Sequence, residues 1–174
     1  MAQHFYTSQW LAVPVEKVFA FFANPANLPL LMPPGMGTRI EQLRVLTPPP
    51  GPIPTDPKRC FTVPAAGIGS EIDISFRPIP LLPFRTGWLA RIIDFQWNSH
   101  FMDEQIKGPF RSFRHRHGIV AEWRDGAEGT LISDSITFEL PFGMAGILLE
   151  TFVRRNLQKS FAARQIRLPH LLGL

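Results

Sequence analysis

Four side chains that can exchange protons fall on three consecutive strand-like segments in the second half of the chain. They are Asp103, His115, His117 and Asp134. Histidine changes its charge near neutral pH, and a neighbouring carboxylate orients the ring and stabilises the charged form. If these residues meet, they could anchor a polar group of a ligand, transfer protons or hold a metal ion.

Alternation along residues 111–123 indicates which of their side chains point inward. Arg114 and Arg116 occupy even positions, whereas the odd positions carry aromatic, imidazole and aliphatic groups. Because successive side chains of a strand point to opposite faces of a sheet, the odd set, including His115 and His117, is predicted to face the interior. By the same pattern Asp134 interrupts an apolar inward face of the next strand.

Two turns then predict which inward residues lie opposite each other. One turn is centred on Gly108-Pro109 and the other on Asp125-Gly126, both strong turn sequences. The predicted opposite pairs are Gln105–Phe113, Asp103–His115 and Phe101–His117 across the first turn, and His117–Asp134 and His115–Ile136 across the second.

The inward patch of Asp103, Gln105, His115, His117 and Asp134 has several interpretations. A buried carboxylate is costly unless it is paired, so the patch could be a structural network that holds strands in register. It could instead contact a ligand or transfer protons. His-x-His with either aspartate could also form a metal triad, but a lone His-x-His is a weak signal and we expect no metal or other cofactor. A bulge that turned either aspartate to solvent would remove all these roles.

Strands and helices around this patch follow from periodicity and from proline and glycine positions. The predicted strands are residues 4–12, 39–46, 70–76, 87–96, 99–107, 111–123 and 129–140, and the predicted helices begin at Pro14, span 25–31 and span 144–166. This order predicts one α+β domain, residues 1–174. In it a curved antiparallel sheet of six to seven strands wraps around the long C-terminal helix, and two short helices follow the first strand.

The net charge of +4 belongs to the last segment. Five of the 18 basic residues and none of the 14 acidic ones lie after residue 150, so the rest carries one more acid than base. We interpret these charges as the outer side of the C-terminal helix and predict no nucleic-acid partner. Contact with an anionic membrane surface is the alternative for this basic face.

Several protein classes are excluded by composition. The single Cys60 cannot form an intrachain disulfide; it lies beside Lys58-Arg59, yet no neighbouring histidine suggests a nucleophile. No signal-peptide pattern and no 18-residue apolar stretch are present, so we expect a cytoplasmic protein without a membrane-spanning segment. Ten of the 18 prolines lie between Pro48 and Pro83, and they cluster in two links, 48–57 and 78–83, that are predicted to rim or cover part of a cavity.

Three stretches resemble the SRPBCC superfamily, the START/Bet v 1-like group that includes polyketide cyclase/dehydrase-like proteins. They are LAVPVEKVFAFFANPANLPLLMPP, FMDEQIKGPFRSFRHRH, and GTLISDSITFELPFG followed by a helix ending in FAARQIRLPHLL. The resemblance covers about residues 4–172 and implies a helix-grip fold, with a cavity between the sheet and the C-terminal helix. Proteins of this group bind lipids, sterols, polyketides or hormones, and some catalyse cyclisation. A shared fold does not transfer a substrate.

We therefore expect a carrier or sensor of a small lipid-, polyketide- or aromatic-type ligand in that cavity. The alternative is a cyclase- or dehydratase-like enzyme that uses His115, His117, Asp103 and Asp134 for acid–base chemistry. The oligomeric state is left open. The residues expected to contact the ligand are Phe101, Asp103, Gln105, Phe113, His115, His117, Asp134, Phe138, Leu149, Phe152, Val153 and Asn156.

Overall fold

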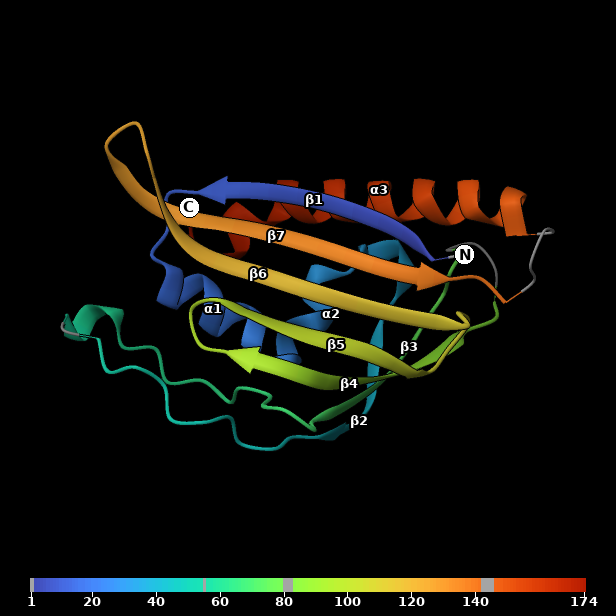
Figure 1. Ribbon diagram of the computed structural model, residues 1–174, viewed down its shortest axis with the longest axis horizontal. Coiled ribbons are helices and arrows are strands. Elements are labelled where there is room, and N and C mark those ends of the chain that lie inside the picture. Colours follow the sequence, from blue (N-terminus) through green and yellow to red (C-terminus); the bar gives the residue numbers. More distant parts are fainter. Residues whose placement is uncertain (1, 55, 80–82, 142–145) are drawn as a thin grey trace.

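In the described part of this protein, the α-helices lie on one face of a single antiparallel sheet (Figure 1). The computed structural model describes residues 2–54, 56–79, 83–141 and 146–174, with side chains except at 146–149. The strands are β1 (Gln3–Leu11), β2 (Arg39–Arg44), β3 (Glu71–Phe76), β4 (Thr86–Gln96), β5 (His100–Lys107), β6 (Ser112–Arg124) and β7 (Ala127–Glu139). The α-helices are α1 (Val15–Ala23), α2 (Leu28–Leu31) and α3 (Gly146–Leu171).

The seven strands are arranged in the order β1-β7-β6-β5-β4-β3-β2. Strands β2 to β7 follow one another as a meander, and β1 closes the far edge by pairing with β7. We call the helix-covered side the concave face. α3 runs along β1 and β7, whereas α1 and α2 lie behind β5 and β6 (Figure 1). The predicted helix-grip arrangement is confirmed, and no helix in the described part of the chain is long and apolar enough to cross a bilayer.

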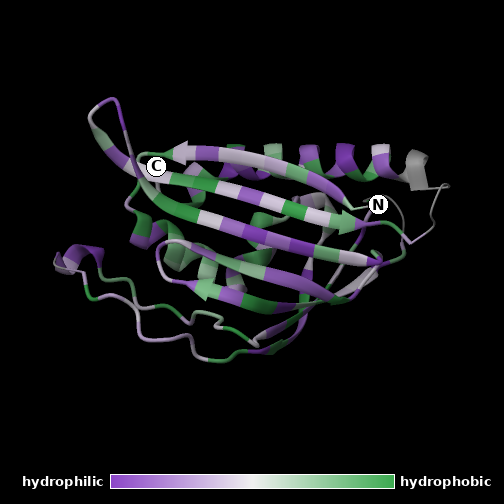
Figure 2. Ribbon diagram, viewed as in Figure 1, coloured by the Kyte–Doolittle hydropathy of each residue, from purple (hydrophilic) through white to green (hydrophobic). Residues whose placement is uncertain are grey.

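The predicted register is confirmed for four of the five inward pairs. The β5–β6 ladder pairs Phe101 with His117 and Asp103 with His115, and the β6–β7 ladder places His117 opposite Asp134 and His115 opposite Ile136. The two-residue β6–β7 turn has positive φ at both Asp125 (50°) and Gly126 (77°), the conformation that suits a tight hairpin. Hydropathy alternates along β6 and β7 accordingly (Figure 2).

The fifth predicted pair, Gln105 with Phe113, is wrong. The β5–β6 ladder ends with Glu104 opposite Arg114. The Gln105 amide turns instead to the backbone of Phe110, donating from Nε2 to the carbonyl (2.8 Å) and accepting from the N–H at Oε1 (3.3 Å). The side chain thus closes the turn, and the two strands separate before they reach Phe113.

The C-terminal helix extends five residues beyond the predicted end at Ile166, although it contains Pro169. Its predicted start at residue 144 falls outside the described residues. A proline inside a helix removes the N–H that would bond to the carbonyl four residues earlier, here that of Gln165. The side chain of Gln9 on β1 donates to that carbonyl at 2.8 Å. The helix therefore continues because β1 supplies the missing donor.

Two apolar clusters fill the concave face. The first lies around α1 and the far end of α3, and it includes Phe19, Ile119, Ile132 and Leu168, all almost inaccessible to solvent. The second consists of Phe113, Ile136, Phe138 and Phe161, with half-buried neighbours that include Val153, Leu157, Trp88 and Phe110. The gap between these clusters is the place where the polar residues of β5, β6 and β7 lie.

We predict that Gln9 and Pro169 are energetically coupled. Gln9→Ala leaves the Gln165 carbonyl without its donor, whereas Pro169→Ala restores a backbone N–H in its place. The cost of Gln9→Ala should therefore be smaller, by about 1 kcal/mol, in the Pro169→Ala background. Urea unfolding of the two single variants and the double variant measures this difference. Equal costs in both backgrounds would contradict the compensation.

Candidate functional site

Asp134 on β7 is the centre of a polar cluster between the two apolar clusters. Its Oδ1 accepts a hydrogen bond from Nε2 of His115 at 2.9 Å and lies 3.1 Å from Nδ1 of His117. Both histidines are on β6, and the confirmed β6–β7 register brings their rings to one carboxylate. The carboxylate itself is inaccessible to solvent.

Arg164 on α3 supplies the positive charge that this buried carboxylate needs. Its Nη1 donates to Oδ1 of Asp134 at 3.1 Å, and its Nη2 donates to Oδ2 of the same residue. The guanidinium also lies over the ring of Phe161 at 4.5 Å and that of Phe22 at 5.5 Å. A two-point contact of this kind fixes both partners in orientation, so it ties α3 to the middle of the sheet.

Asp103 completes the cluster from β5. Its Oδ2 lies 3.3 Å from Nε2 of His117, whose ring stacks on Phe101 with centroids 4.4 Å apart. The two imidazoles are themselves adjacent, with centroids 3.7 Å apart. We call Asp103, His115, His117, Asp134 and Arg164 the polar layer, because along β6, β7 and α3 it separates the two apolar clusters.

The polar layer has a covered side and an accessible side. The side chains of Asp134 and Arg164 are 1% and 6% exposed, whereas those of Asp103, His115 and His117 keep 15%, 13% and 12% of their surface accessible. All three are inward-facing positions of the sheet, so this accessible surface lies on the concave face. The layer can therefore meet a small molecule through Asp103 and the two imidazoles.

The environment moves the pKa values of the two histidines in opposite directions. Burial and the charge of His117 lower the pKa of His115, although the contacts with Asp134 oppose the shift. Burial also acts to lower the pKa of His117, but the carboxylates of Asp103 and Asp134 outweigh it and the pKa is raised. For Asp134, burial is outweighed by both imidazoles and Arg164, so its pKa lies well below the usual range. His117 therefore keeps its proton to a higher pH than His115 does.

The other predicted contact residues are distributed differently. Phe101, Phe113 and Phe138 are buried in the apolar clusters, and Val153 packs against the second cluster. Asn156 is half-buried on α3. Phe152 is 45% exposed, so its side chain is mostly on the surface of the helix. The side chain of Leu149 lies outside the described residues.

Arg164 belongs to the polar layer, so the prediction that it lies on the outer, solvated side of the helix is wrong. A signal was present, because residue 164 follows Phe161 by three and precedes Leu168 by four, the spacing of one helix face. Two further basic residues are also engaged internally. Arg154 binds Glu150, the His4 carbonyl and the Gln3 side chain, and Arg167 donates to the carbonyls of Leu31 and Met32. The basic face offered to a membrane is correspondingly reduced.

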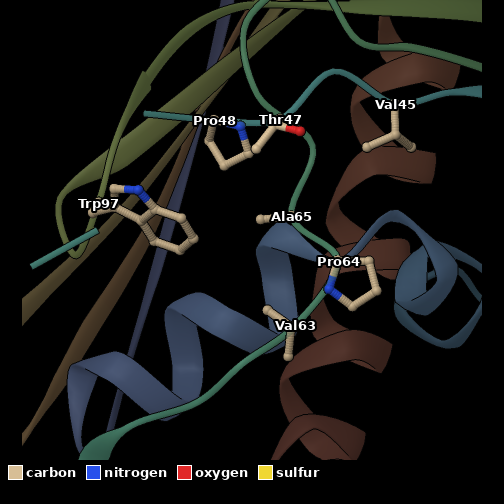
Figure 3. Close-up of a pocket in the computed structure, with 7 residues that line it drawn as sticks. All are labelled: Val45, Thr47, Pro48, Val63, Pro64, Ala65 and Trp97. Atoms are coloured by element: carbon tan, nitrogen blue, oxygen red, sulfur yellow. The ribbon is translucent and has the colours of Figure 1, made fainter. Parts of the chain in front are cut away.

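In the described part of the chain, two surface pockets are lined by no residue of the polar layer. The larger, about 350 Å³, is an apolar groove beside α1 (Figure 3). We call it the Trp97 groove. It is lined by Val45, Thr47, Pro48, Val63, Pro64, Ala65 and Trp97. The proline-rich link thus borders a pocket, but not the expected one between the sheet and α3.

Aromatic side chains separate the Trp97 groove from the polar layer. Trp97, held by a 2.7 Å hydrogen bond from Nε1 to the Pro49 carbonyl, contacts Phe19 at a centroid distance of 5.5 Å. Phe19 in turn contacts Phe101 at 6.2 Å, and Phe101 stacks on His117. Since Phe19 is completely buried, the groove and the layer are separate sites in this structure.

Comparisons with known proteins identify the fold. No protein-family model matches the sequence, and no curated protein does. Solved structures with similar folds include TTHA0849 from Thermus thermophilus, with 15% identity, a TM-score of 0.60 and 94% of each chain covered. Norcoclaurine synthase from Thalictrum flavum, in complex with dopamine and hydroxybenzaldehyde, matches with 14% identity and a TM-score of 0.60 over 97% of this chain and 86% of that one. Ara h 8.0201 matches with 15% identity and a TM-score of 0.57, covering 95% and 96% of the two chains.

Replacing Arg164 should destabilise the protein strongly. Arg164→Met leaves the buried Asp134 carboxylate without its guanidinium, and breaking a buried pair in this way costs about 3–5 kcal/mol. Adding Asp134→Asn should recover part of this loss, since the uncompensated charge is then gone. The exposed Arg155 on the same helix is the control, and Arg155→Met should change the free energy of unfolding by less than about 0.5 kcal/mol. Equal effects of the two methionine variants in urea unfolding would contradict this account.

The opposite pKa shifts predict a stability maximum near the ordinary histidine pKa of about 6.5. His117, whose pKa is raised, stabilises the fold below that value, and its contribution is lost as the pH rises through its folded pKa. His115, whose pKa is lowered, gives stability that is lost as the pH falls below about 6.5 towards its folded pKa.

His117→Gln should therefore flatten the alkaline side of the profile, and His115→Gln should flatten its acid side. The measurement is the free energy of unfolding at a series of pH values, with a chelator present. His100→Gln, which changes a histidine paired with the half-exposed Asp94, is the control. An alkaline decline that persists unchanged in His117→Gln would show that the group responsible lies elsewhere.

Proposed function

We propose that this protein, which has the helix-grip fold of the Bet v 1-like SRPBCC proteins, binds a small hydrophobic ligand between the concave face of the sheet and α3. In this proposal it acts as a cytoplasmic carrier or sensor. One observation supports it most: Asp103, His115 and His117 keep accessible surface on an otherwise apolar concave face. A few polar groups in apolar surroundings are the usual composition of a small-molecule site.

The N-terminal half of α3 is the part of the wall that we expect to move when a ligand binds. From Glu150 to Ser160 no side chain of α3 is buried, whereas Phe161, Arg164 and Leu168 further along the helix are. Segments with few buried contacts open at lower free energy than the core. Outward movement of this half would enlarge the space beside His115 while Arg164 keeps the other half in place.

Aromatic side chains near the polar layer favour a ligand with a planar ring system. Trp88 packs edge-on against Phe113 at 4.7 Å and Phe110 at 5.6 Å, and Phe110 lies 5.1 Å from Phe113. Offset and edge-to-face contacts stabilise aromatic partners beyond the area that they bury. A polyketide or other aromatic ligand with a hydroxyl or carbonyl group fits this lining better than a saturated lipid chain.

Apolar burial alone would give weak binding. About 300 Å² of ligand surface at about 25 cal/mol per Å² gives about 7 kcal/mol before the cost of association is subtracted. Polar anchors therefore decide both affinity and selectivity. Asp103 and His117, as an accessible carboxylate and imidazole side by side, can accept from and donate to one polar group of the ligand.

An enzyme of the cyclase or dehydratase type is the second candidate, favoured by the contact between His115 and Asp134. An imidazole whose Nε2 is fixed by a buried carboxylate at 2.9 Å has the orientation that a general base requires. Its other ring nitrogen then remains for the substrate. The carboxylate–imidazole arrangement is the same whether the bound molecule is converted or only carried.

Native mass spectrometry with a library of hydrophobic compounds, together with 8-anilinonaphthalene-1-sulfonate fluorescence, tests the binding proposal. Asp103→Asn and His117→Gln should each weaken binding about tenfold, since hydrogen bonds to charged groups contribute about 1.5–3 kcal/mol. Val63→Glu, which places a charge in the Trp97 groove, should leave binding unchanged. If Val63→Glu weakened binding and the other two variants did not, the ligand would bind in the Trp97 groove. That result would contradict the proposed site.

Recovery of the bound compound distinguishes a carrier from an enzyme. In a carrier, both the mass and the chromatographic retention of the compound stay constant over time, whereas a dehydration changes the mass and a cyclisation changes the retention. If either change is seen in the wild-type protein, His115→Gln should abolish it while affinity stays within a few-fold. Conversion that continues in a folded His115→Gln variant would exclude this histidine as the base.

A further inference from the structure

We propose that Asp103, His115 and His117 form a binding site for a divalent transition-metal ion of the zinc type, with an open coordination position on the concave face. The proposal adds an occupant to the polar layer and does not depend on whether an apolar ligand binds there. It revises the expectation from sequence, in which the His-x-His pattern alone was too weak to support a metal.

Donor atoms of the three residues already lie close together. One ligand atom from each residue lies within 4.8 Å of the other two. Nε2 of His117 and Oδ2 of Asp103 are 3.3 Å apart. With zinc–ligand bonds of about 2.0–2.2 Å, two ligands of a tetrahedral ion lie about 3.4 Å apart. The closest pair therefore already has the spacing of two ligands on one ion.

Asp134 occupies the place of an outer carboxylate behind both imidazoles. It contacts Nε2 of His115 and Nδ1 of His117, so the opposite nitrogen of each ring points away from it. Metal-binding histidines almost always donate their second N–H to such a group, which fixes the ring and its tautomer. The Nδ1 atom of His117 is buried and, among the described residues, has no well-directed hydrogen bond. A small rotation of this ring towards an ion would align it with Asp134.

Charge balance also favours a cation at this position. The polar layer contains two carboxylates and one guanidinium, so with both histidines neutral it has one negative charge in excess. Neutral imidazoles are the form that binds metal, and a divalent ion would compensate the excess. The carboxylate of Asp134 is held by Arg164 and is not needed as a direct ligand.

The donor set indicates the class of ion. Two imidazole nitrogens and one carboxylate oxygen suit zinc, iron(II) and cobalt(II), whereas calcium and magnesium prefer sites built of oxygen. The three ligand side chains are the accessible members of the layer, at 12–15% exposed. An ion can therefore reach them, and its remaining position would face the space between the sheet and α3.

Titration with cobalt(II), followed by its visible absorption, tests this site without any assay of activity. We expect saturation at one equivalent, with the intense bands of a four- or five-coordinate ion, and displacement of cobalt by zinc. His117→Gln and His115→Gln should abolish these bands. Asp134→Asn should weaken the affinity about 10- to 100-fold, the usual effect of changing an outer-shell partner. His100→Gln, on the same sheet but outside the layer, should bind as the wild type does.

Circular dichroism establishes that each variant is folded before it is titrated. The proposal is overturned if the folded wild-type protein gives no such bands with excess cobalt(II), or if a folded His117→Gln variant keeps them. Binding of 8-anilinonaphthalene-1-sulfonate to the chelator-treated protein is measured in parallel. Loss of the cobalt bands with retained dye binding would overturn the metal site alone, whereas cobalt binding without dye binding would count against the apolar ligand alone.

Discussion

The buried ion pair between Asp134 and Arg164 is the interaction on which the arrangement of this site depends. An unpaired carboxylate in the middle of an apolar sheet face would be strongly unfavourable, and the guanidinium removes that penalty by binding both of its oxygens. The pair holds the C-terminal half of α3 against β7. It also leaves Oδ1 of Asp134 in contact with His115 and His117, so the two imidazoles are oriented by a group that is itself fixed from behind.

The same pair divides the interior into two regions of different packing. On the side of α1, Phe19, Ile119 and Ile132 form a dense apolar core with Leu168 of α3. On the other side, α3 is covered less completely, and the aromatic side chains of the second apolar cluster face its half-buried residues. In the proposed binding mode, the loosely packed half of the helix moves outward while the buried half and the polar layer stay in place. The Trp97 groove lies beyond Phe19 and Phe101, outside this arrangement.

Much of the fold and the meeting of Asp103, His115, His117 and Asp134 could be predicted because strand alternation and two tight turns determine both face and register. The predictions that were wrong depend on side-chain contacts that strand alternation does not determine. Gln105 was expected to face the polar layer, but its amide donates a hydrogen bond to the backbone carbonyl of Phe110 across the turn. Arg164 was assigned to solvent by its charge, although its spacing from Phe161 and Leu168 placed it on the buried face. The helix α3 continues past Pro169 because Gln9 donates to the Gln165 carbonyl. Gln9 lies 156 residues before Gln165 in the sequence. The predicted contacts with a ligand remain predictions.

Nitrogen-15 NMR of the histidine rings at neutral pH, in chelator-treated protein, tests most directly whether Asp134 and Arg164 set the state of the imidazoles. We predict a His115 with its proton on Nε2, donated to Asp134, and a His117 that keeps its second proton to a higher pH than His115 does. This account also predicts that the two rings titrate at clearly different pH values, His117 above His115. Two rings that titrate together near the ordinary histidine pKa of about 6.5, or a His115 with its proton on Nδ1, would contradict it.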